Sequence, residues 1–328
     1  MITQKKWGAL EDGRPILLYE MCNATGCSVS VTNLGGIITS IIVPDRSGIL
    51  GDVVLGYDTP EEYIADSSYM GAMIGRYANR IAGGKFSLNG ITWNLTKNQH
   101  GNTLHGGMGF HKKLWDSEIR ENSVLLHYYS PHGEDGFPGN VDVSILCTLT
   151  DNNCFTMEMT ACSDRDTVCC LTNHTYFNLS GGGNTLSHLF RIYADEYTPL
   201  DRRGLPEGKI CSVVNTPYDF RHERVLETPK IDINYVVQGA QQYNAVVKDP
   251  NSGRKLAVSS DLPGLQFYTA GGLAPRKGKN GSTYGPNSGF CLEPQFFPDS
   301  PNVPTFPSCT LKQGELYNHT ISYCFSIF

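Results

Sequence analysis

The sequence predicts an all-β protein, a large antiparallel β-sandwich with few short helices. Three features lead to this prediction: apolar residues alternate with polar ones at period two, helix signals are few, and turn residues are spread along the chain. The 328 residues include 35 glycines and 18 prolines, which suits many turns between short strands. Because 40% of the residues are hydrophobic and 18% are charged, the composition is that of a globular protein.

Two hairpins have the clearest alternation. Apolar residues occupy every second position over 141–149 and, after a turn at 151–153, over 155–161. This pattern predicts an antiparallel hairpin with one buried face. A second hairpin is expected from 243–247 and 256–259, since a turn rich in Asp, Pro, Asn and Gly joins the two segments.

Shorter strands are expected over 29–34 and 39–43, and one helix start is visible. Thr59 can cap a helix that has Pro60 at its first position and Glu62 at its third. Because no apolar stripe continues beyond it, we expect one or two turns only.

We predict a single domain over residues 1–328. The polar, glycine-rich segment 274–289 is the best linker candidate. Because candidate site residues fall on both sides of this segment, we interpret it as a long surface loop.

Composition and charge exclude several classes of function. The net charge is −6 with acids and bases interspersed, so no nucleic acid partner is expected. No apolar run is long enough to span a bilayer, and the first residues lack a signal-peptide pattern, so we expect a cytoplasmic protein. The eleven cysteines contain no C-x-x-C pair, and we interpret them as buried thiols, with neither disulfides nor a zinc knuckle.

Two segments offer hydrogen-bond donors beside glycine. Arg76, Asn79 and Arg80 lie between Gly75 and the glycine pair at 83–84 and could hold hydroxyl groups or a carboxylate; alternatively, the arginines pair with acids on the surface. His105 precedes two glycines, which allows a ligand to approach closely.

Two further segments offer an acid and a base. His174 lies among Asn173, Thr175 and Tyr176 on an expected strand, and an imidazole can exchange a proton near neutral pH; the alternative is a satisfied core histidine. Glu293 lies between apolar and ring residues, where desolvation would raise its pKa and make it a better base; the alternative is a structural pair with Arg80.

These segments resemble the aldose 1-epimerases, the galactose mutarotases, and they occur in that family's order. The motifs are 75–81 (GRYANRI), 104–107 (LHGG), 173–179 (NHTYFNL) and 292–295 (LEPQ), with 136–140, 197–199 and 216–220 between them. The resemblance extends from about residue 35 to residue 325. It implies the β-supersandwich of that family, a free aldohexose such as galactose or glucose as substrate, and no cofactor and no metal.

The resemblance also implies roles for individual residues. His174 would protonate the ring oxygen and Glu293 would take the proton from the anomeric hydroxyl. The residues that would hold the sugar are Asn79, Arg80, His105, Tyr176, Asp232 and Gln266. The segment around Asp232 keeps the aspartate of the family but not its neighbouring glycine and histidine, which affects the expected loop shape and sugar preference.

Four alternatives remain open from the residues themselves. A relative acting on a hexose 6-phosphate would need cations around the phosphate, and a sugar-binding or regulatory protein of the same fold would lack turnover. A glycoside hydrolase could use Glu293 with Asp232, and a zinc site could use His105, His174 and Glu293. The expected partner is a small monosaccharide, and the protein is expected to be a monomer or a homodimer.

Overall fold

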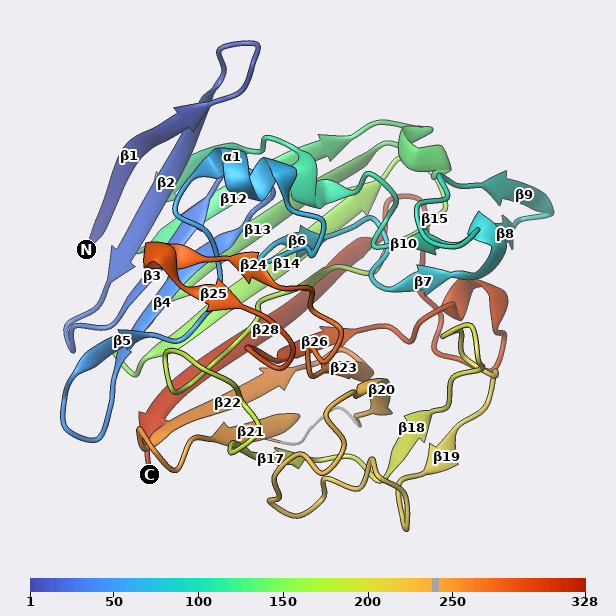
Figure 1. The fold of residues 1–328 in the computed structure, drawn as a ribbon. Coiled ribbons are helices and arrows are strands. Elements are labelled where there is room, and N and C mark those ends of the chain that lie inside the picture. The colour runs from blue at the N-terminus through green and yellow to red at the C-terminus, as the bar shows by residue number, and fades with distance from the viewer. Residues whose placement is uncertain (238–241) are drawn as a thin grey trace.

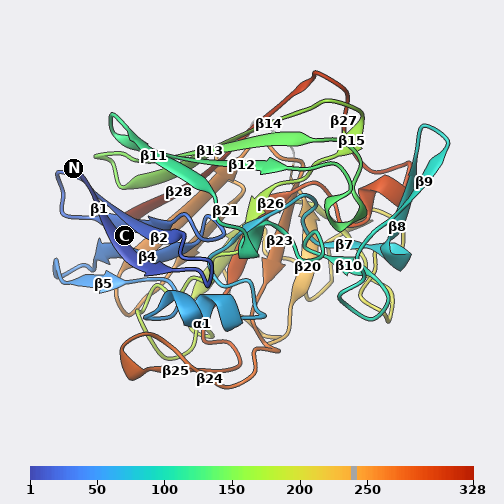
Figure 2. The same cartoon turned by 90° about the horizontal axis from the view of Figure 1, so that it is seen from above.

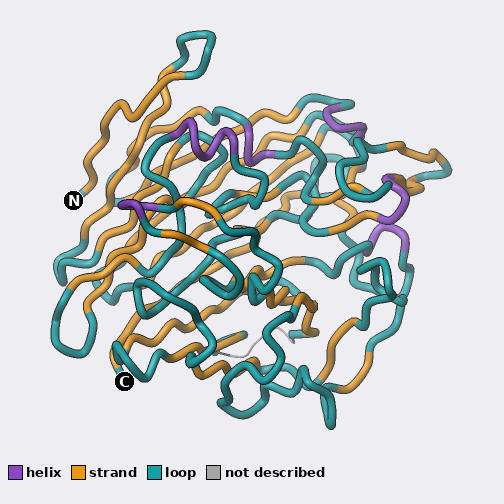
Figure 3. The backbone as a smooth tube through the Cα atoms, viewed as in Figure 1, coloured by secondary structure: helices purple, strands orange, loops and turns teal. Residues whose placement is uncertain are grey.

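The structure of the chain is a computed structural model that describes residues 1–237 and 242–328. Strands dominate it (Figures 1 and 3), and helix α1 (Pro60–Ala65) is the one α-helix of the described part. Five single-turn 3₁₀ helices accompany it in the same residues: η1 (Ala82–Gly84), η2 (Phe110–Lys112), η3 (Glu134–Gly136), η4 (Lys279–Gly281) and η5 (Ser300–Asn302). The expected all-β class with few short helices is therefore confirmed.

A broad eight-stranded antiparallel sheet forms one layer of the molecule. In spatial order its strands are β11 (Asp116–Arg120), β12 (Ser123–Ser130), β13 (Val141–Leu149), β14 (Cys154–Ser163), β28 (Leu316–Ile327), β22 (Arg254–Ser260), β21 (Ala245–Lys248) and β17 (Leu189–Ile192). Strand β28, which follows every other strand in the sequence, pairs with β14 on one side and β22 on the other. The final strand therefore completes the centre of the sheet.

Two five-stranded sheets lie beneath the broad one. The first is a meander of β1 (Ile2–Ala9), β2 (Pro15–Cys22), β3 (Ser28–Thr32), β4 (Ile38–Pro44) and β5 (Leu50–Asp52). The second has the order β19 (Cys211–Ser212), β18 (Glu196–Thr198), β20 (Asp232–Val236), β23 (Gly264–Tyr268) and β26 (Cys291–Gln295). Seen from above, β11 to β14 and β28 lie over both, which gives the expected sandwich (Figure 2).

Five short two-stranded ladders accompany these sheets. They are β6 (Met73–Ile74) with β16 (Thr172–Asn173), β7 (Arg80–Ile81) with β10 (Thr103–Leu104), β8 (Lys85–Leu88) with β9 (Ile91–Asn94), β15 (Thr167–Val168) with β27 (Thr310–Leu311), and β24 (Arg276–Lys277) with β25 (Thr283–Tyr284). The last pair lies within the segment expected as a surface loop. That expectation was wrong in part, because the segment folds back on the protein and buries Tyr284 and 287–289.

Both predicted hairpins are present. Strands β13 and β14 pair with Ile145 opposite Met159, and their alternate apolar residues are buried on one face. Strands β21 and β22 pair with Val247 opposite Leu256, one or two residues from the predicted bounds. Each fully buried apolar side chain of this kind stabilises the fold by about 1.5–3 kcal/mol.

One helix and one cysteine pair complete the comparison with the sequence. Thr59 and Glu62 form the expected capping box at the start of α1. The cysteine expectation was wrong for Cys154 and Cys324, which lie opposite each other on β14 and β28 and form a disulfide. Their positions, 170 residues apart, leave no local spacing signal. The expectation was also wrong for Cys22 and Cys162, whose thiols are free but exposed.

The main core fills the space between the layers. It unites Ile41 of the first five-stranded sheet, Ile145 of the broad sheet, and Ile233, Phe267 and Leu292 of the second five-stranded sheet. The backbone of β20, β23 and β26 is thus fixed from one side by apolar packing. In the described residues, no helix has the length and apolar character needed to cross a membrane.

Candidate active site

A cavity of about 270 Å³ opens beside the second five-stranded sheet. All eight residues expected at the site line it, although they come from positions 79 to 293 of the sequence. The remaining lining residues are Ser67, Ser68, Tyr69, Gln99, Leu104, Tyr268, Gly272, Leu273, Ala274 and Arg276. The fold therefore brings the separate sequence motifs to one place.

The register of strands β20, β23 and β26 brings Asp232, Gln266 and Glu293 together in the site. Gln266 of β23 lies directly opposite Glu293 of β26, and Asp232 of β20 lies opposite Tyr268. Because side chains alternate along a strand, Phe267 and Leu292 point into the core while their neighbours face the cavity. Cys291 shares the face of Glu293, two residues before it.

Strands β7 and β10 position the hydrogen-bond donors Asn79, Arg80 and His105. Leu104 pairs with Arg80, so Asn79 and His105 meet where the two strands end. The backbone N–H of His105 donates to the backbone carbonyl oxygen of Asn79 (3.0 Å), and the backbone N–H of Asn79 donates to Nδ1 of the His105 ring (3.2 Å). Both residues have positive φ, 64° and 51°, a conformation that Asn tolerates better than His.

The backbone contact determines the proton position on His105. Burial, and secondarily the charge of His174, holds the pKa of His105 well below its usual range, so the ring is neutral. A neutral imidazole whose Nδ1 accepts a hydrogen bond carries its proton on Nε2. His105 therefore offers an N–H donor to a ligand.

His174 directly follows β16, and hydrogen bonds of its neighbours Asn173 and Thr175 fix the backbone there. Asn173 donates to the oxygen of Gly71 (2.9 Å) and accepts from the Thr175 hydroxyl (2.5 Å), so neither side chain serves the cavity. The His174 ring stacks on Tyr176, with 5.0 Å between ring centroids. The hydroxyl of Tyr176 in turn donates to the oxygen of Ser68 (3.0 Å).

His174 and Glu293 face each other in the cavity. Nε2 of His174 lies 3.8 Å from Oε1 of Glu293, and both side chains are almost fully buried. Burial lowers the pKa of His174 to about 4. Burial, with the nearby charge of Asp232, raises the pKa of Glu293 well above its usual range. The two opposite shifts make the pair suited to sharing one proton near neutral pH.

Arg80 does not hold Glu293. Nε of Arg80 donates to Gln99 (2.7 Å), and its NH1 lies 3.9 Å from Asp232. Oε2 of Glu293 has no hydrogen-bond partner among the described residues, although it is buried. A buried, unpartnered carboxyl oxygen costs about 1–3 kcal/mol of stability. This favours a functional role for Glu293 over the structural pair with Arg80.

Asp232 lies at the rim of the cavity. Gln266 Nε2 donates to its Oδ1 (2.5 Å), which fixes both side chains. The departure from the family pattern around it leaves Ile231 and Ile233 buried on the core side. The aspartate thus keeps its place in the site despite the altered neighbours.

One residue singled out by the sequence lies elsewhere. Arg76 is buried and donates to the carbonyl oxygens of Ser130, Pro131 and Pro138, so it neither lines the cavity nor pairs with an acid on the surface.

Tyr69, Tyr268 and Arg276 line the cavity and were missed by sequence reasoning. Tyr268 follows Gln266 by two residues on β23, so period-two alternation alone could have found it. Tyr69 packs on His105 with 4.6 Å between ring centroids, from a turn with no motif of its own. Arg276 reaches Asp66 (2.9 Å) from the segment interpreted as a surface loop.

The zinc alternative can be tested against the ring protons. One possible ligand atom from each of His105, His174 and Glu293 lies within 4.8 Å of the others. Nε2 of His105, however, carries the ring proton and has no lone pair for a metal, while Nδ1 is occupied by Asn79. These residues fit hydroxyl groups better than a metal ion.

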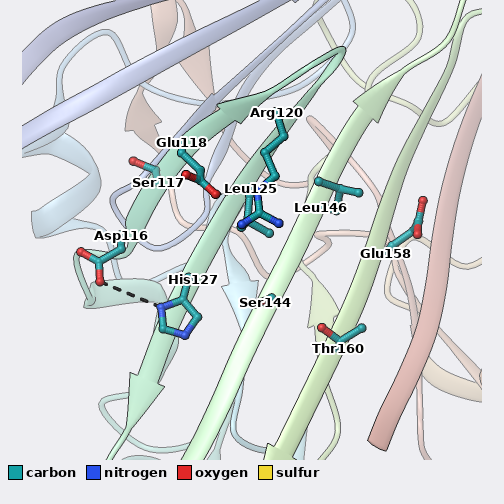
Figure 4. A pocket seen from close by; sticks show the side chains of 10 residues that line it. All are labelled: Asp116, Ser117, Glu118, Arg120, Leu125, His127, Ser144, Leu146, Glu158 and Thr160. Carbon is teal, nitrogen blue, oxygen red and sulfur yellow. Dashed lines mark hydrogen bonds and ion pairs between the residues drawn. The ribbon is translucent and has the colours of Figure 1, made fainter.

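A wider hollow of about 580 Å³ lies on the outer face of the broad sheet (Figure 4). Its side chains rise from β11 to β14, and His127 and Asp116 form an ion pair of 4.0 Å there. These are the solvent-facing positions of strands whose other face is core. The hollow contains none of the eight predicted site residues and no buried acid–base pair among those that line it.

Comparison with known proteins places this geometry in a family. The family model described as Aldose 1-epimerase matches residues 17–324. Galactose mutarotase from Bos taurus is 41% identical over 99% of both chains, and aldose 1-epimerase from Haemophilus influenzae is 39% identical over 93% of both. An aldose epimerase homologue from C. elegans superimposes with a TM-score of 0.90 at 30% identity, covering 94% of this chain and 98% of its own. Galactose 1-epimerase from Lactobacillus acidophilus shares the fold, with a TM-score of 0.88 at 24% identity, over 100% of this chain and 99% of its own.

Proposed function

The chain belongs to the aldose 1-epimerase family, and from this we propose that it interconverts the α and β anomers of a free aldohexose in the cavity that holds His174 and Glu293. It is an aldose 1-epimerase, an isomerase. The relatives from Bos taurus and other mammals are named galactose mutarotases, so galactose is the first substrate to test.

The reaction needs one acid and one base. Glu293, as the carboxylate, takes the proton of the C1 hydroxyl while Nε2–H of His174 donates a proton to the ring oxygen. The C1–O5 bond breaks, O1 becomes the aldehyde oxygen, and the C5 hydroxyl forms. After rotation about C1–C2 the two residues return the protons in opposite roles, and the ring closes as the other anomer.

One observation carries this proposal: the buried carboxyl group of Glu293 lies 3.8 Å from the His174 ring and leaves Oε2 without a partner among the described residues. The opposite pKa shifts raise the proton affinity of Glu293 above that of His174, the reverse of their usual order. A proton that passes from His174 to Glu293 through the substrate therefore moves to the group of higher proton affinity, and ring closure returns it with the roles of the two residues reversed.

The rest of the cavity suits a small polar ligand. Its volume of about 270 Å³ lies just below the roughly 300–1,000 Å³ typical of drug-sized pockets. Asn79, Arg80, His105 and Gln266 supply donors, Asp232 accepts, and Tyr176 supports the His174 ring. We propose these residues as the ones that hold the sugar hydroxyls.

The charges favour a neutral sugar over a hexose 6-phosphate. Two arginines line the cavity, and each already faces a carboxylate: Arg80 lies 3.9 Å from Asp232 and Arg276 lies 2.9 Å from Asp66. A phosphate dianion would have to compete with both carboxylates for these cations.

The proposal is tested by following the optical rotation of freshly dissolved α-D-galactose. Glu293→Gln and His174→Asn should each lower kcat by about 10²- to 10⁴-fold, the usual contribution of one acid or base. Glu134→Gln and His188→Asn remove the same groups outside the cavity and serve as matched controls. Near-normal rates in both cavity variants would contradict the assignment.

Other expectations stay predictions. We propose that the whole chain acts as one catalytic domain, as a monomer or homodimer, without a cofactor. In the described residues nine cysteines are free, which a reducing compartment such as the cytoplasm favours.

A further inference from the structure

The His174 ring lies between two side chains of a single strand. Sγ of Cys291 lies 3.5 Å from its Nδ1, and Oε1 of Glu293 lies 3.8 Å from its Nε2. Cys291 and Glu293 are two residues apart on β26, so the alternation of the strand presents both to the cavity side. All three side chains are almost fully buried. The thiol therefore contacts the nitrogen that does not face the carboxyl group.

We propose that Cys291 is a positioning residue for His174: its sulfur accepts a hydrogen bond from Nδ1–H, and this keeps Nε2 as the nitrogen that gives and regains the catalytic proton. This inference rests on the proposed function, because it concerns the proton transfers of His174 and Glu293. Cys291 lies beside the ring rather than among the residues that line the cavity.

The direction of the hydrogen bond follows from proton balance. If the thiol donated to Nδ1, the neutral ring would hold its one proton on Nε2, and giving that proton to the sugar would leave an imidazolate anion. Burial raises the pKa of the Cys291 thiol well above its usual range, so the thiol cannot replace the lost proton. With Nδ1 protonated throughout, His174 passes only between its cationic and neutral forms.

Aromatic contacts fix the faces of the ring, and Cys291 meets its Nδ1 edge. Tyr176 stacks on the ring, and His105 meets it edge to face with 5.2 Å between centroids. Neither contact distinguishes Nδ1 from the carbon on the opposite side of the ring. The thiol does, because only a nitrogen can donate a hydrogen bond to it.

The test uses Cys291→Ala, Cys291→Ser and, as a matched control, Cys147→Ala, which shortens a buried cysteine of β13 that does not line the cavity. Cys291→Ala should lower kcat about five-fold, the worth of one hydrogen bond, with KM for galactose unchanged. Cys291→Ser keeps an acceptor at a longer distance and should lie between Ala and wild type. Cys147→Ala should leave kcat unchanged.

Nitrogen-15 NMR of histidine-labelled protein provides the second readout, with the His174 signals identified by their loss in His174→Asn. Wild type should show the proton of the neutral ring on Nδ1, and Cys291→Ala should shift it toward Nε2. An unchanged tautomer in Cys291→Ala, or a serine variant no better than alanine, would overturn the proposal. If Glu293→Gln also kept full activity, the proposed function itself would fail, so the two failures are distinguishable.

Discussion

The backbone N–H of Asn79 donates to Nδ1 of His105 across 3.2 Å, and this contact decides which ring nitrogen can serve a ligand. Nδ1 of His105 therefore has a structural role, while Nε2 is left to bind a ligand. Two substitutions can separate these roles, since the Asn amide reaches the position of Nδ1 and the Gln amide reaches that of Nε2.

His105→Asn should retain the contact to Asn79 and lose the donor to the sugar. KM for galactose should rise about three- to ten-fold with a small change in kcat, as expected for one hydrogen bond. His105→Gln should show the reverse, a nearly normal KM and a free energy of unfolding lower by about 1–3 kcal/mol, because the Asn79 N–H is left unpaired. Steady-state polarimetry and urea unfolding measure the two effects. Equal changes in both variants would argue against separate roles.

The opposite pKa shifts of His174 and Glu293 predict a broad, bell-shaped pH profile. The active pair holds one exchangeable proton. Below about pH 4 a second proton binds as His174 becomes charged beside the neutral Glu293, so the base is lost. At high pH the raised pKa of Glu293 is passed and the last proton leaves, so the acid is lost. The measurement is kcat/KM from pH 3 to 10. An acid limb near 6.5, the ordinary histidine value, would contradict this account.

Replacing the catalytic carboxyl group should stabilise the folded protein at alkaline pH. The folded-state pKa of Glu293 lies above its unfolded value. Its favourable contribution is therefore complete below the unfolded pKa and is lost as pH rises through the folded pKa. Glu293→Gln cannot ionise, so its free energy of unfolding at pH 8 should exceed that of wild type by about 0.5–2 kcal/mol. The gain should shrink toward pH 4. Denaturant titrations at both pH values provide the check. If Glu293→Gln were less stable than wild type at pH 8, burial would not be what raises the pKa of Glu293.

Arg76 should matter for stability and not for catalysis. Its guanidinium satisfies three buried carbonyl oxygens, and Arg76→Met should lower the free energy of unfolding by about 2–4 kcal/mol. Arg76→Lys keeps the charge but not the fork geometry of the guanidinium, so its free energy of unfolding should lie between those of Arg76→Met and wild type. Thermal unfolding measures the loss, while KM for galactose in the folded variants should match wild type. A raised KM would show that Arg76 supports the cavity directly.

Much of the fold could be predicted from local pattern. The alternation of β13 and β14 reflects their one buried face, and the Thr59–Glu62 capping box reflects hydrogen bonds within one turn. Such features depend on neighbouring residues, which a sequence displays directly. The same reasoning identified His174 and Glu293 as an acid and a base, but only the family resemblance placed them in one site.

The missed features depend on contacts between distant segments. Arg276 enters the cavity because the segment 274–289 folds back toward Asp66, about 210 residues earlier. Cys154 meets Cys324 only because β28 inserts beside β14. Tyr69 lies in a turn and gains its role from His105. None of these relationships leaves a signature in spacing or composition.

The central place of β28 has a consequence for biosynthesis. While residues 316–327 are still inside the ribosome, β14 and β22 each present an unpaired edge to the cell. Exposed edges of this kind are prone to pairing with other chains. A nascent chain of this protein should therefore depend on chaperone protection until β28 emerges, and premature termination before β28 should yield aggregates rather than a partly active enzyme.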